Sequence, residues 1–319
     1  MNERKKSVVG IDVSYLTFNA HCEGRDYKYS NDREGWRMLC KDTAGEIFAM
    51  EATGNYYYRL ASYLHSKGSA VLVFNPYRVG CFIKSLGVTT KTDKHDAKMM
   101  ARYSEQPDAW KYKWELPPKK LERAKAIVSL LSSLTGIASA SKNVQHASRL
   151  VVGKNDSLLD VMPCISKEVE KQQKHLKKEL CEIVSDVYPD KFRNLQSIPG
   201  IAEYTAAVLL VLGKGLECFA TSRKFARFIG INPKINQSGT SVNGSNSISK
   251  CGNPYIRALL YMCTTASLRS KPCAELRKRL LEKGKSKMLA RVAVMHKLVK
   301  IVFGVIQSGE PFRGGYVAA

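Results

Sequence analysis

Four acidic residues have the types and spacing that could hold a metal ion. Asp12 lies near the end of a short β-branched run, and Glu51 closes a second apolar run. Asp93 and Asp96 lie three residues apart at the expected start of a helix, so both fall on one helical face. Because strand ends of an α/β sheet meet in one crevice, the four carboxylates can meet there.

Such a cluster would serve phosphodiester chemistry. Carboxylates held together repel one another, and hard cations with oxygen ligands relieve that repulsion; we expect Mg²⁺, with Mn²⁺ as the alternative. Ions held there can activate a nucleophile and stabilise the leaving oxygen of a phosphodiester. Each carboxylate alone has a plainer interpretation, since an Asp after a strand is commonly a turn or cap residue and Asp93 could cap its helix. The order of strand Asp, strand Glu and helix Asp-x-x-Asp favours the metal site.

The sequence around these residues indicates an α/β domain that would position them. Short apolar strands are expected at 7–13, 46–51 and 70–75, a hairpin turn at Gly24, and a helix at 56–67. Strands that alternate with helices indicate an α/β sheet with helices packed on it.

Helices dominate the rest of the chain. Pro117 and Pro118 interrupt the pattern, and helical stretches at 121–152 and 165–187 predict a hairpin or coiled coil, for dimerisation or spacing, or else an ordinary two-helix bundle. Pro189 marks the start of a mostly helical C-terminal part. We therefore expect an α/β catalytic domain at 1–116, a helical hairpin at 117–190 and a C-terminal domain at 191–319.

The charge balance indicates a polyanionic partner. Lys and Arg number 51 against 28 Asp and Glu, a net charge of +23. Nucleic acid and an anionic membrane surface both fit, and the spread of basic residues along the whole chain favours nucleic acid. No run approaches the roughly 18 to 20 apolar residues of a membrane span, and no signal peptide is apparent. The nine cysteines show no zinc spacing and indicate a reducing cytoplasm.

Basic and polar residues of the C-terminal part could contact phosphate. Lys250 and Arg257 follow a Gly/Ser/Asn-rich loop at 236–249, which we call the serine loop. Amphipathic helices with a basic polar face are expected between 269 and 300, and they include Arg277, Lys278 and Arg279. Such a face can grip a nucleic-acid backbone without reading its sequence. The plainer interpretation is a solvated helix face.

Several motifs resemble those of one known family. Val9-Gly-Ile-Asp-Val-Ser14, Glu51-Ala-Thr-Gly-Asn-Tyr56 and Lys91-Thr-Asp-Lys-His-Asp-Ala97 resemble the motifs of the DEDD transposases, which include the Piv-type invertase and bridge-RNA-guided insertion-sequence recombinases. The segments at 225–233, 237–239 and 248–260 resemble that family's Gly-x-x-Pro, Ser-Gly and Lys-x-Gly-Asn-x-x-x-Arg signatures, in the same order. One departure is Tyr15, where the family often has a lysine.

The resemblance implies both a fold and a reaction. It implies an N-terminal domain similar to RuvC, the Holliday-junction nuclease, with the RNase H fold, and a C-terminal transposase domain. By motif position Ser238 would attack DNA and form a phosphoserine link, with Ser241, Ser245, Ser247 and Ser249 as nearby competitors. The family also implies a dimer or tetramer with an active site shared between subunits, and a guide RNA made by the same element.

Two other functions are compatible with the sequence. A RuvC-like structure-specific endonuclease would use the carboxylates to activate water and would need no serine. A non-catalytic nucleic-acid-binding protein would use its acidic residues only as caps and turns, and it would be indifferent to Mg²⁺.

Overall fold

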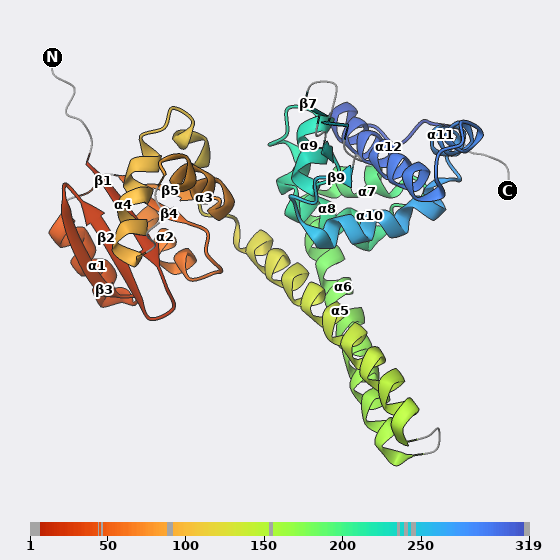
Figure 1. The fold of residues 1–319 in the computed structure, drawn as a ribbon, viewed down its shortest axis with the longest axis horizontal. Coiled ribbons are helices and arrows are strands. Elements are labelled where there is room, and N and C mark those ends of the chain that lie inside the picture. The colour runs from red at the N-terminus through yellow and green to blue at the C-terminus, as the bar shows by residue number, and fades with distance from the viewer. Residues whose placement is uncertain are drawn as a thin grey trace. The chain divides into compact units, whose positions relative to one another are not determined.

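A computed structural model describes residues 7–43, 45, 47–87, 92–152, 156–234, 237–238, 242–243 and 247–315. The chain divides into two compact units, Met1–Pro117 and Pro118–Ala319 (Figure 1). The helical hairpin therefore belongs to the second unit.

The first unit is built on a five-stranded mixed sheet with the strand order β3-β2-β1-β4-β5. The first three strands are antiparallel neighbours, while β4 and β5 run parallel to β1. The turn between β2 and β3 uses Glu23 and Gly24, both at positive φ, as a two-residue hairpin turn requires. The strands are β1 (Val8–Val13), β2 (Thr17–Cys22), β3 (Arg25–Ser30), β4 (Ile47–Glu51) and β5 (Ala70–Phe74).

Helices cover both faces of this sheet. On one face Ile11 packs with Leu39 of α1 and Leu60 of α2. On the other, Ala49 packs with Val79 of α3 and Met100 of α4. The helices of this unit are α1 (Arg33–Thr43), α2 (Tyr57–Ser66), α3 (Pro76–Ser85), α4 (Asp93–Ser104) and the short η1 (Ala109–Tyr112). The predicted α/β domain is thus confirmed at the level of a mixed sheet with packed helices.

The second unit begins with a hairpin of two long helices, α5 (Lys119–Val152) and α6 (Val161–Val187). Helix α6 starts four residues before the predicted stretch because Pro163 falls in its first turn, where proline removes no helical hydrogen bond. One end of the hairpin joins the core of the unit, since Leu131 of α5 and Leu180 of α6 are fully buried with residues of the C-terminal helices.

The remaining helices pack around α8, whose residues from Thr205 to Val211 are all buried. They are α7 (Pro189–Gln196), α8 (Glu203–Leu212), η3 (Lys214–Leu216), α9 (Ser222–Ile229), α10 (Pro254–Ser267), α11 (Lys271–Glu282) and α12 (Lys287–Ser308). Four two-residue strands lie between α9 and α10: β6 (Pro233–Lys234), β7 (Gln237–Ser238), β8 (Val242–Asn243) and β9 (Ser247–Ile248).

Helix α5 corrects one expectation. It contains an 18-residue stretch of mean hydropathy 1.3, long and apolar enough by length and composition to cross a membrane. Serine, glycine and alanine separate the larger apolar residues of this stretch, so no uninterrupted apolar run is visible in the sequence. The signal is weak, since a core helix also meets this criterion, and α5 packs against α6 along the hairpin (Figure 1).

Candidate active site

The ends of β1 and β4 bring Asp12 and Glu51 onto neighbouring strands. Ile11 and Met50 are partners in the parallel register of the two strands, and the two acidic residues directly follow them. Neighbouring strands lie about 4.8 Å apart. Because Ile11 and Met50 are fully buried on the face covered by α1 and α2, the alternation of side chains places both carboxylates on the opposite face.

Helix α4 crosses that opposite face at Gly10, two residues before Asp12. A Cβ atom at Gly10 would lie 2.1 Å from the carbonyl oxygen of Ala97 and 2.4 Å from the backbone nitrogen of Ala101. Asp93 precedes Ala97 by about one helical turn. The helix that carries the acidic pair is therefore in direct contact with the strand that carries Asp12.

The start of α4 is fixed by Thr92. Its Oγ1 accepts a hydrogen bond from the backbone N–H of His95 at 3.3 Å, and its backbone is extended, as an N-cap requires. The plainer interpretation of Asp93 as the cap is thus wrong, because Thr92 occupies that position. Asp93 and Asp96 both lie in the first turn, where the helix dipole favours negative charge.

The carboxylates differ in exposure. Asp12, Glu51 and Asp96 are half-buried, whereas Asp93 is exposed. Glu51 also accepts a hydrogen bond from the hydroxyl of Thr53. Within the described part of the chain, no three His, Cys, Asp or Glu side chains are grouped closely enough to hold a metal ion. The structure therefore pairs Asp12 with Glu51 across two strands and brings α4 against β1, without a closed ligand shell.

This donor set suits a hard cation. All four side chains offer carboxylate oxygens, which Mg²⁺ and Mn²⁺ prefer, rather than the thiolates or imidazoles of zinc sites. His95 was not expected at the site from the sequence, and its buried Nε2 finds no hydrogen-bond partner among the described residues.

An exposed aromatic pair follows the two acidic strands. Tyr15 comes after β1 and Tyr56 after β4, and their ring centroids lie 5.6 Å apart in an edge-to-face arrangement. The side-chain amide of Asn31 donates to the carbonyl oxygens of Ser14, at 2.9 Å, and Tyr56, at 3.3 Å, and so ties the two loops together. In the sequence Tyr15 is apparent only as a departure from a family pattern, because its pairing with Tyr56 depends on tertiary structure.

A short antiparallel ladder of β6 and β9 lies at the base of the serine loop in the second unit. Pro233 and Lys234 of β6 pair with Ile248 and Ser247 of β9. Ser238 pairs through its backbone with Val242 of β8; its side chain lies outside the described residues.

The competing serines are placed unequally. Ser247 is exposed, whereas the hydroxyl of Ser249 is buried and makes no hydrogen bond to any described residue. Burial makes Ser249 a poor nucleophile in this conformation. Ser241 and Ser245 lie outside the described residues.

Arg257 clamps the base of the serine loop. Its Nη1 donates to the carbonyl oxygens of Ile229, at 3.1 Å, Gly252, at 3.1 Å, and Lys250, at 3.3 Å. Gly252 approaches so closely that a Cβ atom there would lie 2.3 Å from the carbonyl oxygen of Phe228. These contacts give Arg257 a structural role, and its predicted phosphate contact stays a prediction. Lys250 is exposed, with a φ of 54°.

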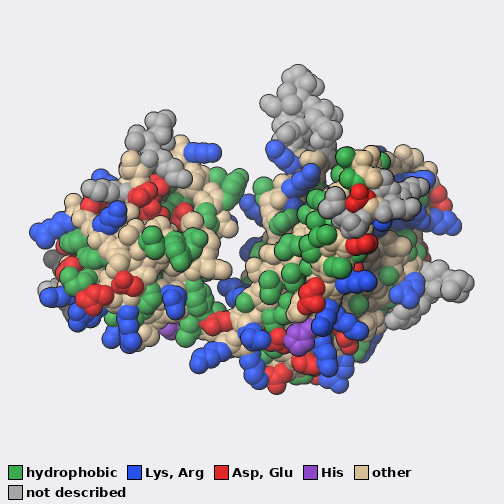
Figure 2. Space-filling model, turned by 90° about the horizontal axis from the view of Figure 1, so that it is seen from below, with side chains coloured by type: hydrophobic (Ala, Val, Ile, Leu, Met, Phe, Trp, Pro, Cys, Tyr) green, Lys and Arg blue, Asp and Glu red, His purple; other side chains and the backbone are tan. Residues whose placement is uncertain are grey.

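The three basic residues expected to act together on α11 face different directions. Arg277 and Lys278 line a small hollow with Leu281 and Glu282, whereas Arg279 lines a separate groove against α12. On the face shown in Figure 2, Lys and Arg side chains are spread over both units rather than gathered in one patch.

Comparisons with known proteins agree with this arrangement. A family model described as a transposase, of the DEDD type named after IS110, matches residues 9–136, and the "Transposase IS116/IS110/IS902 family" model matches residues 192–279. The "Pilin gene-inverting protein" of Moraxella bovis is 28% identical over 332 residues, covering 96% of this chain and 98% of the relative. Its Moraxella lacunata counterpart is 27% identical with the same coverage. The "Insertion element IS110 uncharacterized 43.6 kDa protein" of Streptomyces coelicolor is 28% identical over 117 residues, which are 36% of this chain and 28% of that protein.

Both matching family models describe transposases, which act on DNA. The first model spans most of the first unit and the beginning of α5, the second lies within the second unit, and the chain belongs to the DEDD transposase family. It is accordingly a DNA recombinase in the broad sense, and the family typically uses a divalent metal.

Proposed function

We propose that the chain is the recombinase of an insertion sequence, which cleaves and rejoins DNA through a phosphoserine intermediate. The observation that carries the proposal is the pairing of Asp12 and Glu51 on neighbouring strands, with α4 pressed against β1 at Gly10. The Moraxella relatives, whose names describe gene inversion and which align along almost the whole chain, support recombination. They do not favour the alternative of a RuvC-like endonuclease.

The fold of the first unit supports the proposed chemistry. Three antiparallel strands followed by two parallel ones, in the order β3-β2-β1-β4-β5, agree with the RNase H-like fold that the resemblance implies. In such a fold the acidic residues on the central strand and its neighbour lie beside the helix that carries the last pair.

Each residue has a defined role in this proposal. Asp12, Glu51, Asp93 and Asp96 would hold Mg²⁺ or Mn²⁺, which when bound supplies Lewis-acid stabilisation of the scissile phosphate. Ser238 Oγ attacks phosphorus and the phosphodiester bond to the leaving DNA oxygen breaks. The proton lost by Ser238 is balanced by the one that the leaving oxygen gains, so the DNA ends as a phosphoserine link on one side and a free hydroxyl on the other. Attack by the free DNA hydroxyl of the partner strand reverses this step, rejoins the DNA and releases Ser238.

A self-complementary stripe on α5 supports a dimer or higher oligomer. Leu130, Ile137, Val144 and Val151 recur every seven residues and are 49%, 48%, 47% and 83% exposed. Ser133, Ala140 and Ala147, each three residues after a member of the stripe and so on the same side of the helix, are exposed and small. Large and small residues that alternate at heptad spacing can pack against the same stripe of a second copy. We therefore infer that the hairpin joins copies of this chain.

A guide RNA made by the element is the further partner that the resemblance implies. The net charge of +23 leaves basic surface for RNA as well as DNA. We place the protein in the cytoplasm, associated with the nucleoid, where its DNA substrate lies.

A cleavage assay tests the proposed function. Labelled element-end DNA is incubated with the protein, Mg²⁺ and RNA transcribed from the flanking region, and strand cleavage is followed. Asp12→Asn and Glu51→Gln should each lower cleavage by 10²-fold or more, an order of magnitude typical of lost electrostatic stabilisation. Glu34→Gln, at an exposed residue of α1, is the matched control and should cleave normally. Full cleavage by Asp12→Asn would overturn the assignment.

A further inference from the structure

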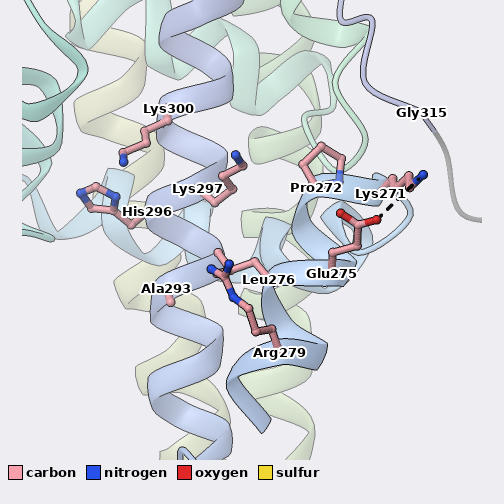
Figure 3. Close-up of a pocket in the computed structure, with 10 residues that line it drawn as sticks. All are labelled: Lys271, Pro272, Glu275, Leu276, Arg279, Ala293, His296, Lys297, Lys300 and Gly315. Carbon is pink, nitrogen blue, oxygen red and sulfur yellow. Dashed lines mark ion pairs between the residues drawn. The ribbon is translucent and has the colours of Figure 1, made fainter. Parts of the chain in front are cut away.

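A groove in the second unit lies between α11 and α12, and we call it the α11–α12 groove. It has a volume of about 690 Å³. Its charged and titratable lining residues are Lys271, Glu275, Arg279, His296, Lys297 and Lys300. Figure 3 shows Lys297 and Arg279 extending into the space between the two helices, with His296 and Lys300 on the α12 side. The groove is distinct from both the acidic strand ends and the serine loop.

Positive charge in the groove is largely uncompensated. Four lining side chains are cationic at neutral pH, and Glu275 is the one lining carboxylate, 3.9 Å from Lys271. Among the residues that the structure describes, none pairs with the side chain of Arg279, Lys297 or Lys300. Like charges held in a concave surface focus a positive potential, which attracts anions.

The kinds of side chain indicate a ligand with several phosphates. Arg279 can donate two parallel hydrogen bonds to one phosphate, whereas Lys297 and Lys300 act as point charges. Lys297 and Lys300 are three residues apart, which separates them by about 4.5 Å along the axis of α12. They can therefore contact successive parts of an extended anion. The described lining includes no Phe, Tyr or Trp on which a base could stack.

We propose that the α11–α12 groove binds the phosphodiester backbone of a nucleic acid, independently of its sequence. This goes beyond the recombination reaction, because the groove holds no acidic cluster and no loop serine. The proposal assigns phosphate binding to Arg279 and not to Arg277 and Lys278. These two residues line another hollow, where Lys278 lies 4.0 Å from Glu282. The groove would anchor a strand through residues other than those proposed to act on the scissile phosphate.

Two matched triple variants test the proposal. One replaces three groove cations, in Arg279→Gln/Lys297→Gln/Lys300→Gln. The other removes the same charge from exposed residues where α11 meets α12, in Lys283→Gln/Lys285→Gln/Lys287→Gln, none of which lines the groove. Both are made in full-length protein, and binding is measured without Mg²⁺, so that cleavage by either a serine or a water nucleophile does not alter the DNA. Thermal unfolding and circular dichroism establish that both variants fold.

Binding to labelled duplex DNA of arbitrary sequence is measured between 50 and 200 mM salt. Each lost phosphate contact lowers the slope of log K against log salt by about 0.9 on duplex DNA. We expect the groove variant to lose about two to three such contacts and to bind at least tenfold more weakly at 50 mM salt. The control variant should lose less than one. Equal losses in the two variants, or no loss in the groove variant, would overturn the proposal.

Further arms identify the nucleic acid and exclude base reading. Duplex DNA, single-stranded DNA and RNA of one sequence are compared, and a scrambled duplex is added. The nucleic acid whose binding falls most in the groove variant, relative to the control variant, is the one the groove holds. A loss that depends on the duplex sequence contradicts backbone binding. Because only binding is measured, failure here leaves the cleavage proposal untouched, and failure of cleavage leaves this one untouched.

Discussion

Gly10 and Ala97 lie so close that a Cβ atom on Gly10 would be 2.1 Å from the carbonyl oxygen of Ala97. Any side chain at this position would push α4 away from β1. Asp12 lies two residues after Gly10, and Asp93 lies four residues before Ala97. The distance between the acidic strand and the acidic helix therefore depends on the absence of a side chain at Gly10.

Gly10→Ala should consequently destabilise the first unit and impair cleavage together. Overpacking in a closely packed core costs about 1–3 kcal/mol, and a clash with backbone atoms leaves little room for relief. Urea denaturation gives the free energy of unfolding. Gly80→Ala in helix α3 is the control, since no atom lies within 4 Å of its Cβ position. That control should be neutral or more stable by up to about 1 kcal/mol. A Gly10→Ala protein as stable and active as the parent would contradict the contact.

Arg257 offers a test of structural against phosphate-binding roles. Its Nη1 hydrogen-bonds to three carbonyl oxygens around the base of the serine loop. Arg257→Lys keeps the charge but loses the planar donor geometry. If the clamp dominates, Lys should destabilise the second unit about as much as Gln, by roughly 1–3 kcal/mol for buried acceptors left unpaired. DNA affinity restored by Lys but not by Gln, with unchanged stability in both, would instead favour the phosphate contact.

The heptad stripe on α5 predicts a change in oligomeric state. Ile137→Lys/Val144→Lys places two charges in the proposed seam, where they would be desolvated without a partner. Multi-angle light scattering should show a shift toward monomer, while circular dichroism retains the helices. Ser139→Lys/His146→Lys adds lysines at the same spacing on another exposed part of α5 and should leave the mass unchanged. Equal masses for the two double variants would contradict the proposal that the stripe on α5 joins copies of this chain.

His296 predicts a pH dependence of stability. Burial lowers the pKa of His296, and nearby Lys300 lowers it further. Below the ordinary histidine pKa of about 6.5, the unfolded chain therefore binds a proton that the folded protein does not. The free energy of unfolding consequently decreases as the pH is lowered, until the pH reaches the lowered pKa of the folded protein. Chemical denaturation between pH 7.5 and 5.5 measures this loss, which His296→Gln should reduce. A variant that loses as much stability over this range as the parent would contradict the assignment.

The sequence predicted the parts of the fold that depend on local patterns. The β-branched run around Ile11 and the apolar run before Glu51 gave β1 and β4, and Asp93 does begin a helix. The close approach at Gly10 was not predictable, because a glycine inside a strand does not reveal which element packs on it. The clamp of Arg257 was missed for the same reason, since its acceptors belong to segments that meet only in three dimensions.

The direction in which each basic residue of α11 points was also not predictable from the sequence. Arg277, Lys278 and Arg279 were grouped because they are consecutive, yet successive residues of a helix point about 100° apart. Only the packing of α11 on α12 shows that Arg279 enters the groove. The side chain of Ser238 lies outside the described residues, so its role continues to rest on motif position.

Covalent capture tests the central proposal most directly. Protein is incubated with labelled element-end DNA, Mg²⁺ and flanking RNA, and denaturing gels are examined for a protein–DNA adduct. We predict an adduct that is lost in Ser238→Ala and in Asp12→Asn, and mass spectrometry should place the DNA on Ser238. Cleavage without any adduct, still dependent on Asp12, would contradict the serine mechanism and indicate water as the nucleophile.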